Sequence, residues 1–337
     1  MTEEQLASPS PSTPTAPDAP SDGAVAAAAA AARARTIGLV AMAIAVLTFS
    51  TSSPLIKWSE STGSVVAFWR MVGAVIAWWL LLSIAHVTRG RPLPSARTWR
   101  LAVAPGLFFG ANIALFFTAV NKTAIAHAEF IAALSPLILL PAGAWLFDEH
   151  PNWRALRWGL LSLVGVALVL FFGPASGAAT VGGDLLMIIV LVAWVCYLLT
   201  SKRARSIGVG TVDFMACMMP IGLLTAGPIA LLIAGRDIVS LSARGWLVVA
   251  ILVVMTGMVS HALIVFAQKQ IPVATIGVMQ TAQPALAVFF AFVFLDEAVR
   301  APQIVGMALV IAGLAMFTWT SQRAALRRAQ PRNVRGS

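Results

Sequence analysis

Charge is scarce in this chain of 337 residues. Lysine, arginine, aspartate and glutamate together make up 11% of the residues, whereas a soluble domain averages about 25%. Apolar residues reach 59%, and the mean hydropathy is +0.87. This composition excludes an ordinary soluble domain. Together with apolar runs of about 20 residues, it predicts an integral membrane protein.

Cysteine, histidine and intramembrane acids are also rare. Both cysteines, Cys196 and Cys217, lie in apolar segments, where small packing residues are expected rather than a disulfide. The His, Asp and Glu residues within the apolar segments amount to His86, His127, His261 and Glu129. They have neither the spacing of metal ligands nor the makeup of a nucleophile–base set. No Gly-rich segment ends in Gly-Lys-Ser/Thr, so nucleotide-driven pumping is not supported. We therefore expect no enzyme, no metal and no cofactor.

The net charge of +10 resides in short loops between apolar segments, and no stripe of alternating basic and aromatic residues indicates nucleic acid. The hydropathy pattern predicts an all-α integral membrane protein of ten transmembrane helices. Their expected ranges are 36–58, 63–87, 99–120, 123–147, 153–172, 183–203, 211–234, 244–268, 274–295 and 302–321.

The basic residues indicate the orientation of these helices. With a cytoplasmic N-terminus, 17 of the 23 Lys and Arg residues fall on the inner side and 5 on the outer side, and Arg70 lies within the membrane. This bias follows the positive-inside rule and places both termini in the cytoplasm.

The two ends of the chain differ from the rest. Residues 2–23 are rich in Pro, Ser and Ala, with four acids and no base, so they lack the positive start and apolar core of a secretory signal. We expect residues 1–35 to form a disordered cytoplasmic tail, with helix in its alanine run, and residues 322–337 to form a basic cytoplasmic tail.

The stretch from Leu107 to Leu170 recurs in outline 148 positions later. Ser135-Pro136 then falls on Gln283-Pro284, and Asp148-Glu149 falls on Asp296-Glu297. The pattern predicts two five-helix repeats, at 36–172 and 183–321. Because five is odd, the second repeat enters the membrane from the other side, which gives inverted repeats of the kind that support alternating access.

These features resemble the EamA-type transporters of the drug/metabolite transporter superfamily. Besides the repeated pairs, the matching motifs are Phe68-Trp69-Arg70, Gly183-Asp184-Leu185-Leu186 and Ala193-Trp194. The resemblance implies a central cavity between the repeats, lined mainly by helices three, four, eight and nine. The sequence departs from symmetry, because helix six ends in Lys202, Arg203 and Arg205, and helix seven has no counterpart of Arg70.

Arg70 and Glu129 are predicted at similar depths inside the membrane. An ionised side chain there is costly unless it is paired or wetted. One interpretation is an Arg70–Glu129 pair that locks two helices together, or an Arg70 that snorkels to the headgroups. The other is functional: Arg70 meets a substrate carboxylate, and Glu129 carries a proton. His261 is either a satisfied polar group or a proton relay.

Further polar residues fall well inside their spans: Asn112, Ser135, Tyr197, Ser260, Gln280 and Gln283. Each could simply join helices by hydrogen bonds. Ser135 and Gln283, however, each precede a proline at matched positions, and paired interruptions are the best sequence indication of a transporter site. Hydroxyls at 48–53 before Pro54 indicate either a bent helix that lines water or hydroxyls bonded back to the helix.

We expect Arg70, Asn112, Ser135, Tyr197, Gln280 and Gln283 to bind substrate, with Glu129 and His261 coupling protons. The predicted function is transport, favouring export, of a small organic metabolite such as an amino acid across the bacterial inner membrane. The rivals are a non-transporting membrane receptor or scaffold and a membrane-embedded enzyme. The expected partners are the solute and the lipid bilayer, without nucleic acid. The sequence leaves open whether the protein forms a homodimer.

Overall fold

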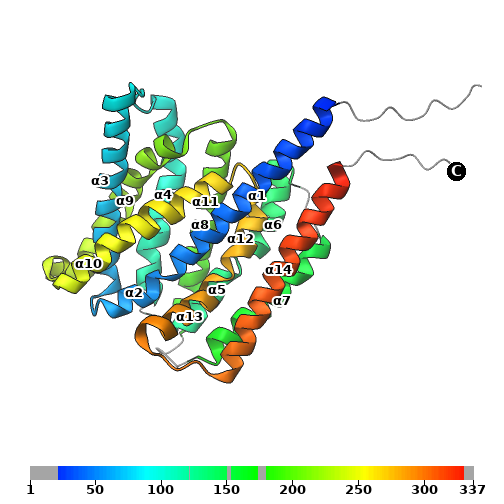
Figure 1. Ribbon diagram of the computed structural model, residues 1–337. Coiled ribbons are helices and arrows are strands. Elements are labelled where there is room, and N and C mark those ends of the chain that lie inside the picture. Colours follow the sequence, from blue (N-terminus) through cyan, green and yellow to red (C-terminus); the bar gives the residue numbers. More distant parts are fainter. Residues whose placement is uncertain (1–21, 121, 150–152, 174–179, 330–337) are drawn as a thin grey trace, which may run out of the picture.

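The computed structural model describes residues 22–120, 122–149, 153–173 and 180–329, and within these ranges the regular elements are all helices (Figure 1). Ten of the described stretches are long and apolar enough to cross a membrane. In chain order they are built from α1 (Asp22–Ser50) with α2 (Ser52–Trp58), α3 (Gly63–Arg89), α4 (Ala96–Val120), α5 (Ile125–Ala133) with α6 (Ser135–Phe147), α7 (Trp153–Phe171), α8 (Val181–Ser206), α9 (Thr211–Ala234) with the 3-10 helix η1 (Gly235–Val239), α10 (Ala243–Leu252) with the π-helix η2 (Val253–Ser260) and α11 (His261–Ala267), α12 (Val273–Gln280) with α13 (Gln283–Leu295), and α14 (Ala301–Ala329).

The predicted helix ranges agree with these elements except at the chain ends. α1 already begins at Asp22, so the alanine run is helical and the tail predicted for 1–35 is helical from residue 22 onward. Alanine is the strongest helix former, which explains the early start. α14 likewise continues past residue 321 to Ala329. Residues 1–21 and 330–337 lie outside the described ranges.

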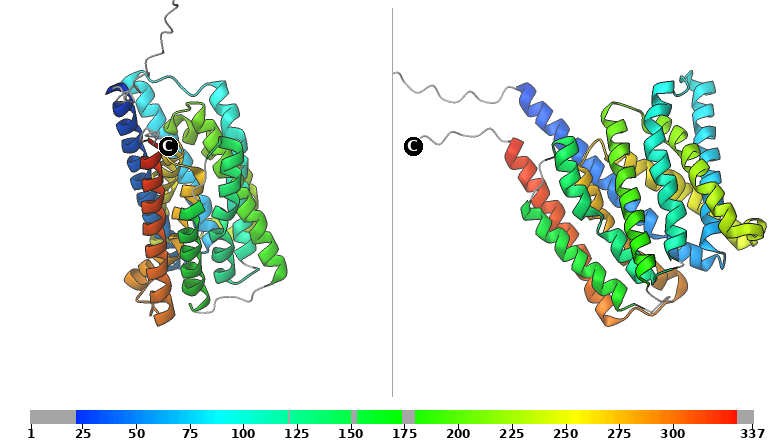
Figure 2. Two further views of the ribbon diagram at one scale, coloured as in Figure 1. Left: turned by 90° about the vertical axis from the view of Figure 1, so that its right-hand side faces the viewer. Right: turned by 180° about the vertical axis from the view of Figure 1, so that it is seen from behind.

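The start of α1 and the end of α14 lie on the same side of the molecule (Figures 1 and 2). We refer to this side as the terminal side and to the other as the opposite side. Because successive spans alternate in direction, α3, α6 and α8 end on the terminal side, whereas α2 and α13 end on the opposite side.

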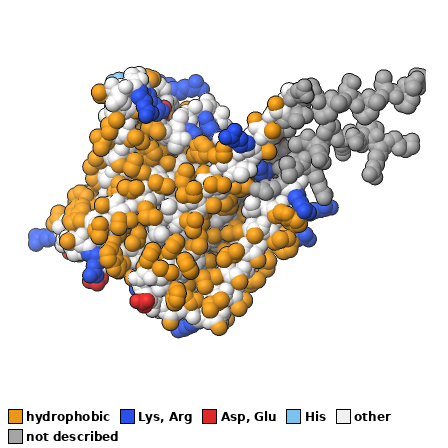
Figure 3. Space-filling model, in the orientation of Figure 1, with side chains coloured by type: hydrophobic (Ala, Val, Ile, Leu, Met, Phe, Trp, Pro, Cys, Tyr) orange, Lys and Arg blue, Asp and Glu red, His pale blue; other side chains and the backbone are white. Residues whose placement is uncertain are grey.

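The outer surface of the helices is apolar. No more than 50% of the hydrophobic window of any of the ten spans is buried within the protein. Trp145 and Leu232 are each 84% exposed, and hydrophobic side chains cover the face seen in Figure 3, with Lys and Arg gathered at its edges. Such a surface suits the hydrocarbon of a bilayer, so the chain is a multi-pass membrane protein.

Small residues allow the helices to approach closely. A Cβ at Gly110 of α4 would lie 2.5 Å from the carbonyl oxygen of Gly222 in α9, so this crossing has no room for a side chain at Gly110. At the periphery, Gly165 of α7 and Gly306 of α14 face each other, and a Cβ on either would lie 2.6 Å from the other's carbonyl oxygen. Small residues at helix crossings are the usual device for packing inside a membrane.

Candidate functional site

Two of the spans are broken at matched positions. The fourth breaks at Leu134, between α5 and α6, and the ninth breaks at Thr281-Ala282, between α12 and α13. Ser135 and Gln283, 148 positions apart, are the first residues after the breaks, and each is followed by proline. Proline fits the first turn of a helix but removes a backbone donor, so it favours a new helix start at this position.

The two broken spans pack against each other through α6 and α12. A Cβ at Gly277 of α12 would lie 3.3 Å from Pro136 Cα, so α6 packs tightly on α12. Glu129 of α5 occupies the position that corresponds to Gly277 under the 148-residue offset. At this matched position the first repeat therefore has a carboxylate, whereas the second repeat has a glycine without a side chain.

Arg70 of α3 reaches the π-helix η2. Its Nη1 donates to Thr256 Oγ1 at 3.1 Å, and the neighbouring Trp78 Nε1 donates to the carbonyl of Gly257 at 3.0 Å. The described ion pairs do not include one between Arg70 and Glu129. The described contacts therefore lack the Arg70–Glu129 pair that one of the two interpretations proposed. Arg70 is a half-buried cation whose described hydrogen-bond partner is a neutral hydroxyl.

The first span also meets η2. α1 ends at Ser50, α2 begins at Ser52, and Thr48 and Ser260 share a hydrogen bond of 2.7 Å. Ser50 and Thr51 donate back to carbonyls of α1 at 2.7 and 2.8 Å. These bonds agree with the prediction that the hydroxyls at 48–53 bond back to their own helix. A π-helix widens the turn, which is a common arrangement at functional sites.

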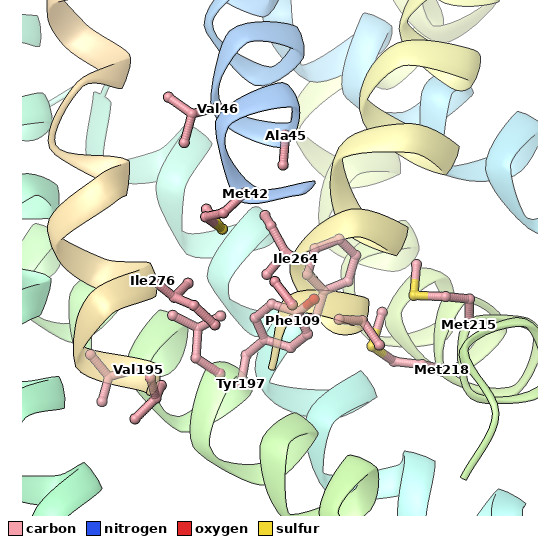
Figure 4. Close-up of a cluster of buried hydrophobic side chains, with 14 of the residues drawn as sticks. Met42, Ala45, Val46, Phe109, Val195, Tyr197, Met215, Met218, Ile264 and Ile276 are labelled. Carbon is pink, nitrogen blue, oxygen red and sulfur yellow. The ribbon is translucent and has the colours of Figure 1, made fainter. Parts of the chain in front are cut away.

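The side chain of His261 lies among four aromatic rings that come from three other helices. Ring centroids of Phe109, Phe49, Tyr197 and Trp194 lie 4.8, 5.4, 6.3 and 6.4 Å from the imidazole. We call these four side chains the ring cluster. Figure 4 shows Phe109 and Tyr197 side by side among Met42, Ile264 and Ile276. The ring cluster joins α1, α4 and α8 to α11 at the interface between the repeats.

Several polar groups in this region lack partners. His261 is 1% exposed, and neither of its ring nitrogens has a hydrogen-bond partner among the described residues. The hydroxyls of Tyr197 and Ser201 lie close to each other without forming a hydrogen bond of good geometry. Each such buried group costs about 1–3 kcal/mol when it is left unpaired. A protein keeps such a cost where water, a proton or a ligand satisfies the group during function.

The remaining predicted residues divide into two groups. Asn112 Nδ2 donates to the carbonyl of Val190 at 3.0 Å, and Gln280 Oε1 accepts from Trp194 Nε1 at 3.3 Å, so both join helices. Gln280 is also thereby attached to the ring cluster. Within the described part of the chain, the side chains of Glu129, Ser135 and Gln283 make no hydrogen bond or ion pair, and Ser135 is only 3% exposed.

A shallow apolar crevice lies apart from this centre, between α3, α4 and α9. Phe68, Met71, Ile113, Ala226 and Ile233 are among the residues that line it. It contains no charged side chain, so it does not extend the polar arrangement around Arg70 and His261.

Known proteins decide the family. The model of the EamA-like transporter family matches this chain twice, at residues 36–171 and 181–319. The chain belongs to the EamA-like transporter family. An EamA-like chain with two matched segments has the two-repeat architecture that the sequence predicted, and the all-helical fold with ten apolar spans agrees with it.

Relatives of this EamA-like protein are transporters. An uncharacterized transporter of Synechocystis sp. is 25% identical over 300 residues, covering 81% of this chain and 84% of the relative. Threonine/homoserine exporters of Salmonella typhimurium and Escherichia coli are 23% and 22% identical over 245 residues, covering 67% of this chain and 77% of theirs. A solved crystal structure with a TM-score of 0.67 and 22% identity covers 87% of this chain and 98% of that one, which supports the fold.

The sequence did not indicate every residue of this region. Thr256, Phe49, Phe109 and Trp194 were not among the predicted site residues, because a hydroxyl or an aromatic ring in an apolar span looks like any packing residue. The π-helix has no sequence signal that periodicity could detect. These residues become notable only through their contacts with Arg70 and His261.

Proposed function

We propose that this EamA-like transporter exports a small zwitterionic metabolite of the amino-acid class in exchange for protons. The observation that carries the proposal is Arg70. It is a cation inside the membrane-spanning region that lacks a carboxylate partner among the described residues, and it hydrogen-bonds only the hydroxyl of Thr256. A substrate carboxylate would supply the missing negative charge, and planar bidentate contact with a carboxylate is what a guanidinium does best.

Other groups in the spans support the rest of the solute's chemistry. The ring cluster offers aromatic faces, which attract an ammonium group or apolar side chain. Gln283 offers both an acceptor and a donor, and it has no partner within the described residues. Glu129 and His261 are the groups whose protonation could change during the cycle, since neither has a described hydrogen-bond partner.

The orientation and location belong to the same proposal. The terminal side carries the ends of α3 and α8 with Arg89, Lys202 and Arg203, so the positive-inside rule makes it the cytoplasmic side of a bacterial inner membrane. The Salmonella and Escherichia relatives are threonine/homoserine exporters, which supports export of an amino acid. The receptor and enzyme alternatives find no support among transporter relatives.

Inside-out membrane vesicles test the proposal directly. Vesicles that contain the protein should accumulate at least one radiolabelled amino acid from a panel that includes threonine and homoserine. An acidic lumen should stimulate this uptake, and a protonophore should abolish it. Vesicles with Arg70→Met should show only background uptake. Equal uptake by wild-type and Arg70→Met vesicles for every amino acid in the panel would refute the proposal.

A further inference from the structure

On the terminal side, the carboxylate of Glu149 joins three helices. The chain turns at Asp148, whose φ of 53° is left-handed, and Glu149 folds back from the end of α6. Its two oxygens accept from the backbone N–H of Val273, the first residue of α12, at 3.1 and 3.0 Å. Lys202 of α8 forms an ion pair with the same carboxylate, and both side chains are only 12% exposed.

The neighbours of Glu149 are arranged to hold it there. Lys202 Nζ also donates to the carbonyl of Ile271 at 3.3 Å and lies 5.3 Å from the ring centroid of Phe147. Gly143 makes room for the fold-back, since a Cβ there would lie 2.6 Å from Glu149 Oε2 and 2.9 Å from Val273 Cγ1. The carboxylate is therefore fixed by charge, by a backbone donor and by the absence of a side chain opposite it.

The second repeat has the same turn, but its glutamate lacks the backbone contact that Glu149 makes. Asp296 has a φ of 51°, and Glu297 follows it as Glu149 follows Asp148. Glu297 pairs with Lys57 at the end of α2, with side-chain exposures of 32% and 67%, and the described contacts give it no backbone donor. The position that matches Gly143 is Ala291.

Burial along the ninth span shows the same difference between the two sides. In α12, on the terminal side, Val273, Gln280 and all of 275–278 are buried. In α13, which runs to the opposite side, the buried residues are Pro284 and Ala285. Met42, Ile264 and Ile276 fill the space beside the ring cluster (Figure 4). Neighbouring helices thus enclose most of α12, whereas most of α13 is only partly covered by protein.

We propose that Glu149 is a latch that closes the terminal side of the transport pathway by binding the amide of Val273 and Lys202, and that Glu297 is its counterpart for the opposite side. In this structure the first latch is closed and the second is released. Under the repeat offset, the position that matches Val273 is Ile125, at the start of α5. In the alternate state Glu297, still paired with Lys57, would accept from that backbone N–H while Glu149 lets go of Val273. The inference rests on the proposed transport function for its role, but the two contacts can be tested separately from transport.

The test measures access to a thiol beneath the latch. Thr275, which is 5% exposed in α12, is changed to cysteine in a chain whose two native cysteines are alanine. Purified protein in detergent is labelled with a bulky polar maleimide. Glu149→Gln should raise the labelling rate about tenfold, because a hydrogen bond to a charged group is worth roughly one decade in an opening equilibrium. Glu297→Gln is the matched control and should not raise the rate, because it removes a contact of the alternate state.

A second variant keeps every charge. Gly143→Ala should also raise the labelling rate, because the new methyl group displaces the Glu149 carboxylate. Unfolded samples are excluded by gel filtration and by the melting temperature. Unchanged labelling in Glu149→Gln, or an equal rise in Glu297→Gln, would overturn the latch. Because labelling requires no substrate, a rise without any amino-acid transport would keep the latch and reject the proposed function.

Discussion

Replacing Arg70 by methionine separates a structural arginine from one that binds substrate. The substitution removes one hydrogen bond, from Nη1 to Thr256 Oγ1 at 3.1 Å. Thr256 keeps its own bond to the carbonyl of Leu252 at 2.8 Å, so no orphaned group remains. A hydrogen bond to a charged group is worth about 1.5–3 kcal/mol. Removing a charge that lacks an acidic partner returns part of a desolvation cost of several kcal/mol, discounted because Arg70 is half-buried.

These two contributions oppose each other, so Arg70→Met should leave the melting temperature in detergent unchanged or slightly higher. Transport should respond very differently. If the guanidinium binds a substrate carboxylate, loss of that contact should raise the KM by about 10- to 150-fold. Arg70→Lys keeps the charge but loses the planar fork, so its KM should lie between those of wild type and Arg70→Met.

The control is Arg244→Met. Arg244 is an exposed arginine whose Nη1 contacts Glu60 at 2.7 Å on the opposite side, and its loss should change neither stability nor KM. Normal transport by Arg70→Met would refute the substrate-binding role. If Arg70→Met fails to accumulate but accumulates again when Glu129→Gln is added, the result would support a structural Arg70–Glu129 pair instead.

Three further predictions concern packing, the site and topology. Gly306→Ala should destabilise the protein by about 1–3 kcal/mol, seen as a lower melting temperature, because its methyl group would meet a carbonyl of α7 at 2.6 Å. Gln283→Leu should raise the KM while the melting temperature stays constant. A lower melting temperature with an unchanged KM would mean that Gln283 joins helices instead. In a chain without native cysteines, single cysteines at Arg89 and Arg203 should resist an impermeant thiol reagent in intact cells, and one at Arg236 should react. Labelling at either of the first two positions would reverse the proposed orientation.

The fold could largely be predicted from the sequence because the bilayer permits few solutions. Every backbone polar group must be paired within a span, so apolar runs of about 20 residues specify helices. The 148-residue offset then located the breaks before Ser135 and Gln283, since proline acts through local backbone geometry that the sequence states directly. Helix was expected in the alanine run, but the start at Asp22 was not predicted, because hydropathy does not mark a helix outside an apolar run.

The site was less predictable because its contacts join residues that are far apart in the chain. From the sequence, a pair between Arg70 and Glu129 was one of two interpretations, whereas Arg70 contacts Thr256, 186 positions away. Equal depth in the membrane says nothing about which faces of two helices meet. The aromatic neighbours of His261 come from three other helices, and no spacing rule connects them.

The π-helix η2 has a consequence for the angular phase of the eighth span. Leu252 and His261 are both almost fully buried, yet nine residues of ordinary α-helix make about 2.5 turns, which would point them in opposite directions. The wider turns of Val253–Ser260 take up this half-turn mismatch and let both side chains face inward. Tightening these turns to α-helical geometry would rotate His261 away from Phe49 and Phe109 without altering a single side chain. The backbone geometry of η2 therefore sets the direction in which the side chain of His261 points, independently of the chemistry of any side chain.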